Sequence, residues 1–234
     1  MYYLAYLFDN GFSHSTISFY ISGLGFYCKI NDMKDITQKF VVRKILEGIK
    51  RSRPKQKDMR LPITRELLKV ILSSLTTLCK SSNEVNLFKA AFALAFPGLF
   101  RVGELTVSNG MCRHVLLMSN LSILNNHLKV DICSSKTDQY GKGKFKLVNE
   151  YIKVRPLIQG SLFCHYHGSS LSRYQFVAVL KKALMSVNIP CNIFSSHSFR
   201  IKAATSLSME GISDSHIMQL GRWRSYSYKG YIRI

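Results

Sequence analysis

The sequence predicts a mainly helical protein with one small antiparallel sheet, an α+β fold in two domains. Apolar residues recur at helical spacing over most of the 234 residues, and alternation with a period of two is confined to about 112–163. A basic, proline-containing segment at 51–62 separates the two parts. Hydrophobic residues make up 47% of the chain, which is typical of a packed globular protein rather than a disordered one.

The charge balance favours a polyanionic partner. Lys and Arg number 33 against 13 Asp and Glu, a formal net charge of +20. Such an excess costs free energy through self-repulsion, so nucleic acid is the first candidate partner and a membrane surface the second. No long amphipathic basic helix supports membrane binding, and the longest apolar run, 90–100, is about half a membrane span. We therefore expect a soluble protein that does not bind membranes.

The six cysteines are scattered and form no C-x-x-C pair. This pattern favours reduced thiols in an intracellular protein over a disulfide scaffold or a zinc ribbon. The run CHYH at 164–167 contains metal-ligating residue types, but no second ligand pair stands at zinc-finger spacing. We interpret it as a loop, and expect neither a metal ion nor another cofactor.

Residues 1–52 predict a small domain of three helices, with Ser13 or Ser15 as the N-cap of the second. The polar face of that second helix suits contact with a DNA groove, although an ordinary helical bundle fits the pattern equally well. The linker at 53–62 follows. Its basic residues and the arginine before it are candidates for contact with a phosphate backbone, and a solvated charge run is the alternative; they are Arg51, Arg53, Lys55 and Lys57.

The second domain, 63–234, opens with a helix that Thr64 can cap. A buried helix follows and breaks near Pro97 and Gly98, after which come Arg101 and Glu104. An Arg–Glu pair at this spacing is commonly a surface salt bridge. Because Arg101 follows an almost wholly apolar stretch, we expect its guanidinium to emerge from the core at a fixed position.

Between 112 and 163 we expect short strands of an antiparallel sheet, separated by Asn-Asn and by a Gly-Lys-Gly turn. An amphipathic helix then runs from near Ser172 to Pro190. The stretch 195–234 predicts three short helices, the second capped by Ser213 or Asp214 and ending at Gly221 as a C-cap.

His197 and Arg200 are three residues apart and share one face of the first of these helices. The chain then ends in alternating basic and aromatic residues. An ordinary basic, tyrosine-rich tail is one interpretation. A histidine, paired guanidiniums and a phenol brought together would instead indicate chemistry on a phosphate, because guanidinium grips phosphate oxygens and a phenol can act as nucleophile.

Three motifs occur in this order: FRVGEL with Arg101, HSFR with His197 and Arg200, and LGRW followed, nine residues after Arg222, by Tyr231. This series resembles the signature of the tyrosine recombinase (phage integrase-like) family, in which H-x-x-R precedes L-G-[H/W] and a nucleophilic tyrosine. The resemblance implies a helical core-binding domain over 1–52 and an integrase-like catalytic domain over 63–234.

The resemblance also implies roles for single residues. Arg101 and Arg200 would neutralise the phosphate, Tyr231 would attack to form a 3′-phosphotyrosyl link, and His197 would assist proton transfer. Lys136, in S-K-T on a β-hairpin, would protonate the leaving 5′ oxygen. The other lysines that compete for this role are more simply a solvated basic strand; they are Lys142, Lys144 and Lys146.

Arg222 occupies the position that is usually His or Trp in the family, and Trp223 fits if the register slips by one. Tyr226 and Tyr228 compete with Tyr231 for the nucleophile, but they follow Gly221 too closely for the usual spacing. The resemblance implies double-stranded DNA as the partner, with a homo-oligomer on DNA. Only three residues follow Tyr231, so we do not expect the further helix with which many members dock on a neighbouring protomer.

The sequence pattern GRW…YIR looks most like the eukaryotic, transposon-borne Crypton branch of the family. This resemblance implies a mobile element that acts in the nucleus. A domesticated derivative that binds DNA without cutting it is the alternative. A type IB topoisomerase would use the same active-site chemistry, and a plain helical adaptor would show no salt-dependent DNA binding.

Overall fold

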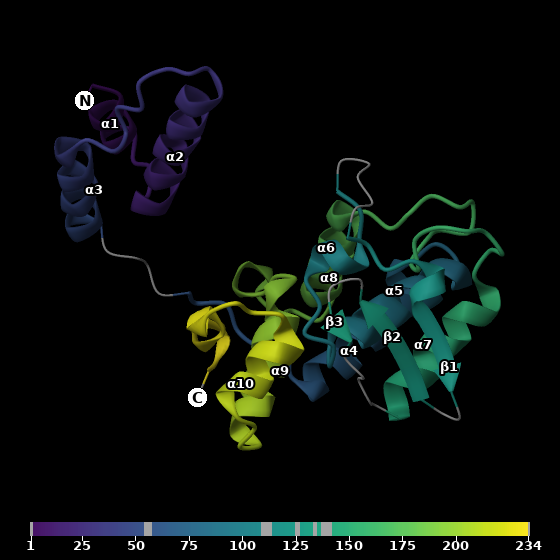
Figure 1. Cartoon of the computed structure of the whole chain (residues 1–234). Helices are drawn as coiled ribbons and strands as arrows, with labels where there is room; N and C mark the ends of the chain where they lie inside the picture. Colours follow the sequence, from purple (N-terminus) through teal and green to yellow (C-terminus); the bar gives the residue numbers. More distant parts are fainter. Residues whose placement is uncertain are drawn as a thin grey trace. The chain divides into compact units, whose positions relative to one another are not determined.

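The computed structural model describes residues 2–53, 58–108, 114–124, 127–132, 135–136 and 142–233. The chain divides into two compact units, Met1–Asp58 and Met59–Ile234 (Figure 1). The boundary lies inside the segment 53–62 that we predicted as the linker. The fold is mainly helical with a small antiparallel sheet, as the sequence predicted.

The first unit contains the helices α1 (Tyr2–Asp9), α2 (His14–Ile30) and α3 (Phe40–Ser52). Ser13 caps α2, because its Oγ accepts a hydrogen bond from the Thr16 amide at 3.2 Å. The three helices meet in a small core of buried aliphatic side chains: Leu4, Leu7, Ile17, Ile21 and Ile49. Arg53 ties the end of α3 to the α1–α2 turn, donating to the carbonyls of Phe8 and Phe12 at 2.6 and 2.8 Å.

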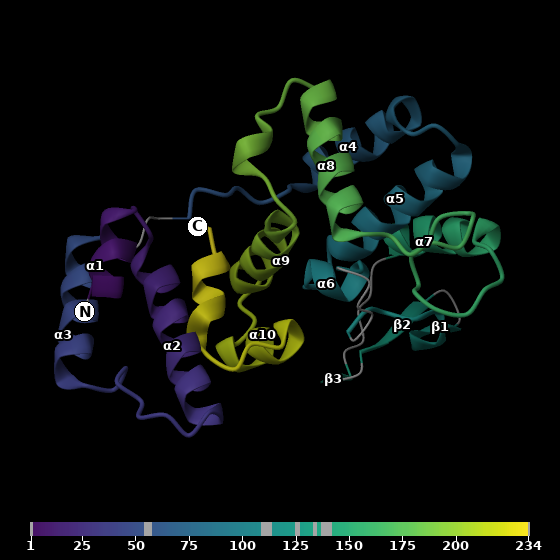
Figure 2. The same cartoon turned by 90° about the horizontal axis from the view of Figure 1, so that it is seen from above.

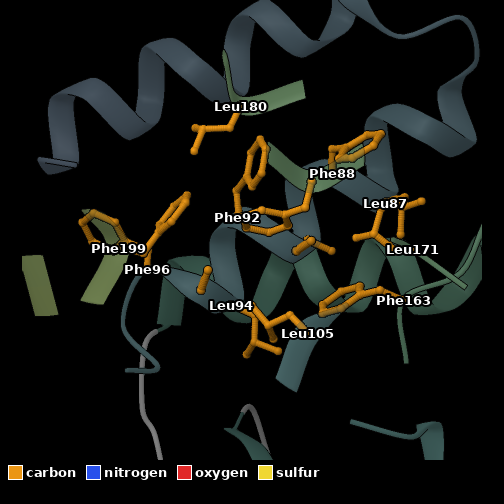
Figure 3. Close-up of a cluster of buried hydrophobic side chains, with 14 of the residues drawn as sticks. Leu87, Phe88, Phe92, Leu94, Phe96, Leu105, Phe163, Leu171, Leu180 and Phe199 are labelled. Atoms are coloured by element: carbon orange, nitrogen blue, oxygen red, sulfur yellow. The ribbon is translucent and has the colours of Figure 1, made fainter. Parts of the chain in front are cut away.

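The second unit is built around α5 (Ser82–Ala95), with α4 (Arg65–Leu78), α7 (Lys142–Val154) and α8 (Arg173–Ser186) in the same core. A helix that is apolar on all sides must be covered on all sides, and eight residues of α5 are buried. Figure 3 shows its aromatic rows, with Phe88, Phe92 and Phe96 pointing into the cluster. Phe92 stacks on Phe199 at 5.8 Å between ring centroids, which attaches the C-terminal helices to this core.

The helix starts in the second unit follow the sequence prediction. Thr64 caps α4, and its Oγ1 accepts from the Leu67 amide at 3.2 Å. Ser172 caps α8 in a reciprocal pair with Gln175. The buried helix α5 ends at Ala95, just before Pro97, as expected.

The sheet contains β1 (Leu121–Leu124), β2 (His127–Ile132) and β3 (Ser135–Lys136), antiparallel in the order β1-β2-β3. Lys136 pairs with Asp131 across the β2–β3 hairpin. The prediction of further strands up to 163 was wrong, because α7 begins at Lys142, within the stretch where we expected a turn. Val148 and Tyr151 are three residues apart and both buried, so helical periodicity decides this segment.

The last elements are α9 (His197–Met209), α10 (Asp214–Gly221) and the 3₁₀ helix η3 (Tyr226–Tyr231), which lie side by side (Figure 2). Ser213 caps α10 as expected. Gly221 is still helical, however, and the left-handed C-cap residue is Arg222, with φ of 56°. The short helix α6 (Val102–Leu105) and the 3₁₀ turns η1 (Met118–Asn120) and η2 (Cys191–Ile193) complete the unit.

None of the helices in the described part of the chain combines the length and the apolar composition needed to cross a bilayer. The same residues contain no group of three or more His, Cys, Asp or Glu side chains arranged to hold a metal ion. The four cysteines that the structure describes are free thiols: Cys28, Cys79, Cys164 and Cys191.

Candidate active site

A cavity of about 320 Å³ in the second unit collects side chains from widely separated parts of the chain. Arg101 comes from the start of α6, His197 and Arg200 from α9, and Tyr231 from η3. The remaining lining residues are Val102, Gly103, Arg173, Ser196 and Trp223. With Trp223, the structure therefore brings together five residues that the sequence analysis singled out and that lie up to 130 positions apart (231 − 101).

Arg200 is the buried cation of the cavity, with 3% of its surface exposed. Its guanidinium donates to the Leu99 carbonyl and to the Gly221 carbonyl at 3.1 Å, and lies 4.4 Å above the Trp223 ring. Burial, together with the charge of Arg101, lowers the pKa of Arg200 to about 10, so the side chain stays charged at neutral pH. Three of its five N–H donors remain for a ligand.

Arg101 is the more accessible cation, with about half of its side chain exposed (51%). It donates to Glu104 Oε1 at 3.3 Å and to the Arg222 carbonyl at 2.9 Å, and its backbone amide donates to Glu104 Oε2 at 2.8 Å. The two side-chain bonds hold the guanidinium at the edge of the cavity, and the third fixes the backbone of Arg101. The expectation of an arginine that emerges from the core at a fixed position matches this geometry.

Tyr231 lies against His197, with the phenol oxygen 3.1 Å from Nδ1. The backbone of Tyr231 is tied to α9 through Thr205, whose hydroxyl donates to the Tyr231 carbonyl at 3.4 Å and accepts from the Arg233 amide at 3.0 Å. Ala203 and Ala204 of α9 are small and buried in the same apolar cluster as the Tyr231 ring. Small side chains here let η3 pack closely against α9.

The two other tyrosines of η3 point elsewhere. Tyr226 is 64% exposed and Tyr228 is fully buried, and neither lines the cavity. Among these three phenols, Tyr231 alone is placed beside the arginines.

Arg222 is not among the residues that line the cavity. Its buried guanidinium forms an ion pair with Glu104 at 2.6 Å and also donates to the Leu99 carbonyl at 3.3 Å. Because Arg222 takes the left-handed turn itself, the next residue, Trp223, enters the cavity instead. The sequence analysis left open whether Arg222 or Trp223 takes the family's His/Trp position. Of the two, Trp223 is the residue that lines the cavity.

The other residues predicted for the site are placed as follows. Lys136 belongs to β3, and its side chain lies outside the described residues. Arg51 is exposed on α3, whereas two donors of Arg53 bind carbonyls of its own unit. Lys55 and Lys57 also lie outside the described residues. Their contact with DNA stays a prediction.

Arg173 is a residue of the cavity that the sequence analysis missed. It is the first residue of α8, and the sequence there shows an ordinary amphipathic helix with a serine cap. Its place beside Arg101 and Arg200 results from tertiary packing, so no local sequence pattern indicates it.

Residues 63–231 match the model of the phage integrase family. This chain belongs to that family. Solved structures share the fold over nearly the whole chain. A XerH site-specific recombinase bound to a palindromic difH substrate, in a post-cleavage complex, matches with a TM-score of 0.69 at 18% identity, covering 99% of this chain. The chain spans about two thirds of that XerH chain (65%).

Two further structures show the same fold. The Tn1549 transposon integrase in complex with transposon right end DNA matches at a TM-score of 0.65 and 15% identity, covering 99% of this chain and 78% of that one. A lambda integrase dimer bound to a COC′ core site matches with a TM-score of 0.60 at 16% identity, covering 98% of this chain and 62% of that one. No curated protein sequence matches the chain significantly.

Proposed function

We propose that this protein cleaves and rejoins double-stranded DNA through a 3′-phosphotyrosyl intermediate, with Tyr231 as the nucleophile. The observation that carries the proposal is the Tyr231 hydroxyl, 3.1 Å from His197 Nδ1, in a cavity that Arg101 and Arg200 also line. A DNA phosphodiester resists attack because its negative charge repels the nucleophile. The two guanidiniums supply the opposing charge in positions that the protein has already fixed.

Each arginine has a distinct part in this scheme. Arg200 is buried and immobilised by two carbonyls, so it offers a preorganised charge that needs no rearrangement as the phosphorane forms. Arg101 is half exposed and grips the phosphate from the entrance. Removal of one such preorganised donor typically lowers a rate by about a hundred- to a thousandfold.

The proton steps use His197 and Lys136. His197 Nδ1 hydrogen-bonds the Tyr231 hydroxyl and accepts its proton as the phenol oxygen bonds to phosphorus. Lys136, on the β2–β3 hairpin, donates a proton to the departing 5′ oxygen. Trp223 lines the cavity and its indole N–H donates to a phosphate oxygen. The covalent link conserves the bond energy, so rejoining to a 5′-hydroxyl requires no nucleotide.

We further propose that the protein comes from a mobile element of the Crypton type and acts in the nucleus, as a homo-oligomer on DNA. The sequence pattern GRW…YIR supports the Crypton assignment, and the net charge of +20 supports a DNA partner. The Tn1549 integrase, which is a transposon protein, has the same fold.

A suicide substrate tests the catalytic proposal. Duplexes that the protein binds are first selected from a random-sequence pool, and nicks are then placed near the bound site so that cleavage traps the protein on the DNA. The wild-type chain should form a covalent adduct that resists denaturation, and Tyr231→Phe should form none while still binding DNA. Tyr226→Phe is the matched control, because that exposed phenol lies on the same element and should be dispensable.

Either of two results would overturn the catalytic assignment. An adduct that survives Tyr231→Phe would place the nucleophile elsewhere. DNA binding by the wild-type chain without any adduct would indicate a derivative that no longer cuts. Relaxation of a supercoiled plasmid lacking the selected site would instead indicate topoisomerase activity.

A further inference from the structure

Ser196 lines the active-site cavity and has no part in the scheme proposed above. The residue is nearly buried, with 9% of its surface exposed. Within the part of the chain that the structure describes, its hydroxyl forms no hydrogen bond with the protein. Ser196 Oγ is not one of the side-chain atoms that are sealed from solvent without a partner, so solvent reaches it. The cavity therefore contains a hydroxyl that is available to a ligand.

The two neighbouring serines are both committed to the turn that starts α9. Ser195 Oγ accepts from the His197 amide at 3.2 Å, and Ser198 Oγ accepts from the Ser195 amide at 3.1 Å. This reciprocal pair resembles a capping box. Ser196 itself has helical backbone angles, with φ of −56° and ψ of −25°, instead of the extended angles of a capping residue. Its hydroxyl is therefore not needed to start the helix.

Helical geometry places Ser196 next to Arg200. The two residues are four apart on one face of α9, and side chains at that spacing have Cβ atoms about 5–6 Å apart. Side chains on a helix lean toward its N-terminus, so Arg200 leans in the direction of Ser196. Both residues line the cavity. An anionic oxygen bound by Arg200 would therefore lie within reach of the Ser196 hydroxyl.

A neutral donor suits a cavity that is already rich in cations. Arg101, Arg173 and Arg200 all line it. Burial and, next, the charge of Arg101 lower the pKa of Arg200 to about 10, so like charges already oppose one another here. A further cation would add to this repulsion, whereas a hydroxyl donates a hydrogen bond without adding charge. Such a bond to an anionic oxygen is about twice as strong as one between neutral partners.

We propose that Ser196 is a further catalytic residue, whose hydroxyl donates a hydrogen bond to one non-bridging oxygen of the scissile phosphate. The inference rests on the proposed function, since that function places the phosphate in this cavity. The bond strengthens as Tyr231 attacks, because a donor fixed in position stabilises the charge that develops on this oxygen. Ser196 forms no covalent bond and transfers no proton.

The rate of adduct formation gives the first test. Ser196→Ala removes the hydroxyl and changes the size of the side chain little. We expect it to slow adduct formation on the suicide substrate by about ten- to a hundredfold, the range that corresponds to one hydrogen bond to a charged group. Ser208→Ala is the matched control, because Ser208 is a partly buried serine of the same helix that does not line the cavity. This control should react at the wild-type rate.

Binding of uncleaved DNA distinguishes Ser196 from a cationic contact. The probe is the duplex selected from the random pool, and binding is measured in the Tyr231→Phe background. Ser196→Ala should leave the slope of log K against log salt unchanged, because a hydroxyl displaces no counterion, whereas Arg101→Ala should reduce it by about 1. A reduced slope in Ser196→Ala would indicate that other phosphate contacts had moved, and would contradict the proposal.

Methylphosphonates at the scissile position identify the oxygen. Each of the two diastereomers replaces one non-bridging oxygen by a methyl group, and its cleavage is compared between the wild-type and Ser196→Ala chains. In the diastereomer that keeps the bound oxygen, the variant should be slower by the same factor as on ordinary DNA. In the other, the two chains should react at equal rates, because the hydroxyl has no oxygen to bind. A role in folding or packing would slow both alike.

The inference is overturned if Ser196→Ala reacts as fast as Ser208→Ala, or if it slows both diastereomers equally. It is also overturned if sulfur in place of the leaving 5′ oxygen restores the rate of Ser196→Ala. A thiol has a pKa near 8.5 and leaves without a proton donor, so that result would mean that Ser196 acts on the leaving group. These results refute this inference alone, because the wild-type chain still forms its adduct. Absence of a wild-type adduct would refute the proposed function and this inference with it.

Discussion

Glu104 is the only acidic residue among the described contacts of the arginines in and beside the cavity, and it binds two of them at once, Arg101 and Arg222. Oε1 accepts from Arg101 and from Arg222 Nε, and Oε2 accepts from Arg222 and from the Arg101 amide. Three guanidiniums around one cavity repel each other, and this carboxylate offsets part of that repulsion. The Arg222 carbonyl also accepts from Arg101, so Arg222 helps to position Arg101 without itself lining the cavity.

Arg222→Ala should therefore act through stability first. The Glu104 side chain is 9% exposed, and loss of a buried ion-pair partner typically costs about 3–5 kcal/mol. We expect a drop of that order in the free energy of unfolding, measured by urea denaturation. Arg222→Lys should recover part of it, because the ammonium keeps the charge but cannot bind both carboxylate oxygens in the same geometry.

Arg224→Ala is the control, since Arg224 is exposed and should change the free energy of unfolding by less than about 0.5 kcal/mol. The family position of Arg222 suggests a different role, direct contact with the phosphate. If that role were correct, Arg222→Ala would slow adduct formation while leaving the unfolding curve unchanged.

At the scale of the elements, local signals in the sequence located the starts of four helices. Ser13, Thr64, Ser172 and Ser213 each cap a helix in the structure. The prediction failed at α7, where Lys-Gly-Lys-Phe-Lys-Leu alternates like a strand, although burial of Val148 and Tyr151 against α5 imposes a helix. Tertiary packing overrode a local pattern there, as it commonly does for short amphipathic segments.

The end of α10 shows how an element can fix a side chain of the site. A Cβ added to Gly221 would lie 1.7 Å from the Trp223 ring, so the indole occupies the space that any larger residue would need. Gly221 also supplies a carbonyl to Arg200. The sequence pattern indicated a glycine at a helix end, but only the structure shows that the indole is what requires it.

We expect Gly221→Ala to displace Trp223 and to lower adduct formation by about tenfold or more, the loss that corresponds to at least 1.4 kcal/mol of transition-state stabilisation. Trp223 is the single tryptophan of the chain, so its fluorescence reports the displacement directly. Gly230→Ala is the matched control, because a Cβ there meets nothing within 4 Å. Unchanged emission in Gly221→Ala would contradict this account.

At the scale of the molecule, the site depends on contacts between distant segments. The motifs FRVGEL and HSFR indicated Arg101, His197 and Arg200 from the sequence, and spacing indicated Tyr231. The spacing favoured Arg222 over Trp223 for the family's His/Trp position, and no local pattern indicated Arg173. Both follow from how α6, α8 and α10 meet around the core of α5, which only long-range packing determines.

If Tyr231 is the nucleophile, as we propose, this packing also decides which chain supplies it. Tyr231 bonds to His197 of its own chain, Thr205 holds its backbone on α9, and Tyr228 is buried three residues earlier. Release of η3 to a neighbouring protomer would expose that buried ring and break these bonds. We therefore expect cleavage in cis, with the tyrosine and the arginines of one catalytic event in the same chain.

Complementation between inactive variants measures this. Arg101→Ala and Tyr231→Phe chains, tagged to differ in size, should form no adduct when mixed, because neither chain has both the nucleophile and the complete cavity. Delivery in trans would restore an adduct carrying the Arg101→Ala chain, whose Tyr231 would enter the intact cavity of the Tyr231→Phe chain. A mixture of wild-type and Tyr231→Phe chains is the control: its adducts should carry the wild-type tag alone, because only those chains have the nucleophile, and their formation shows that mixing itself does not suppress cleavage.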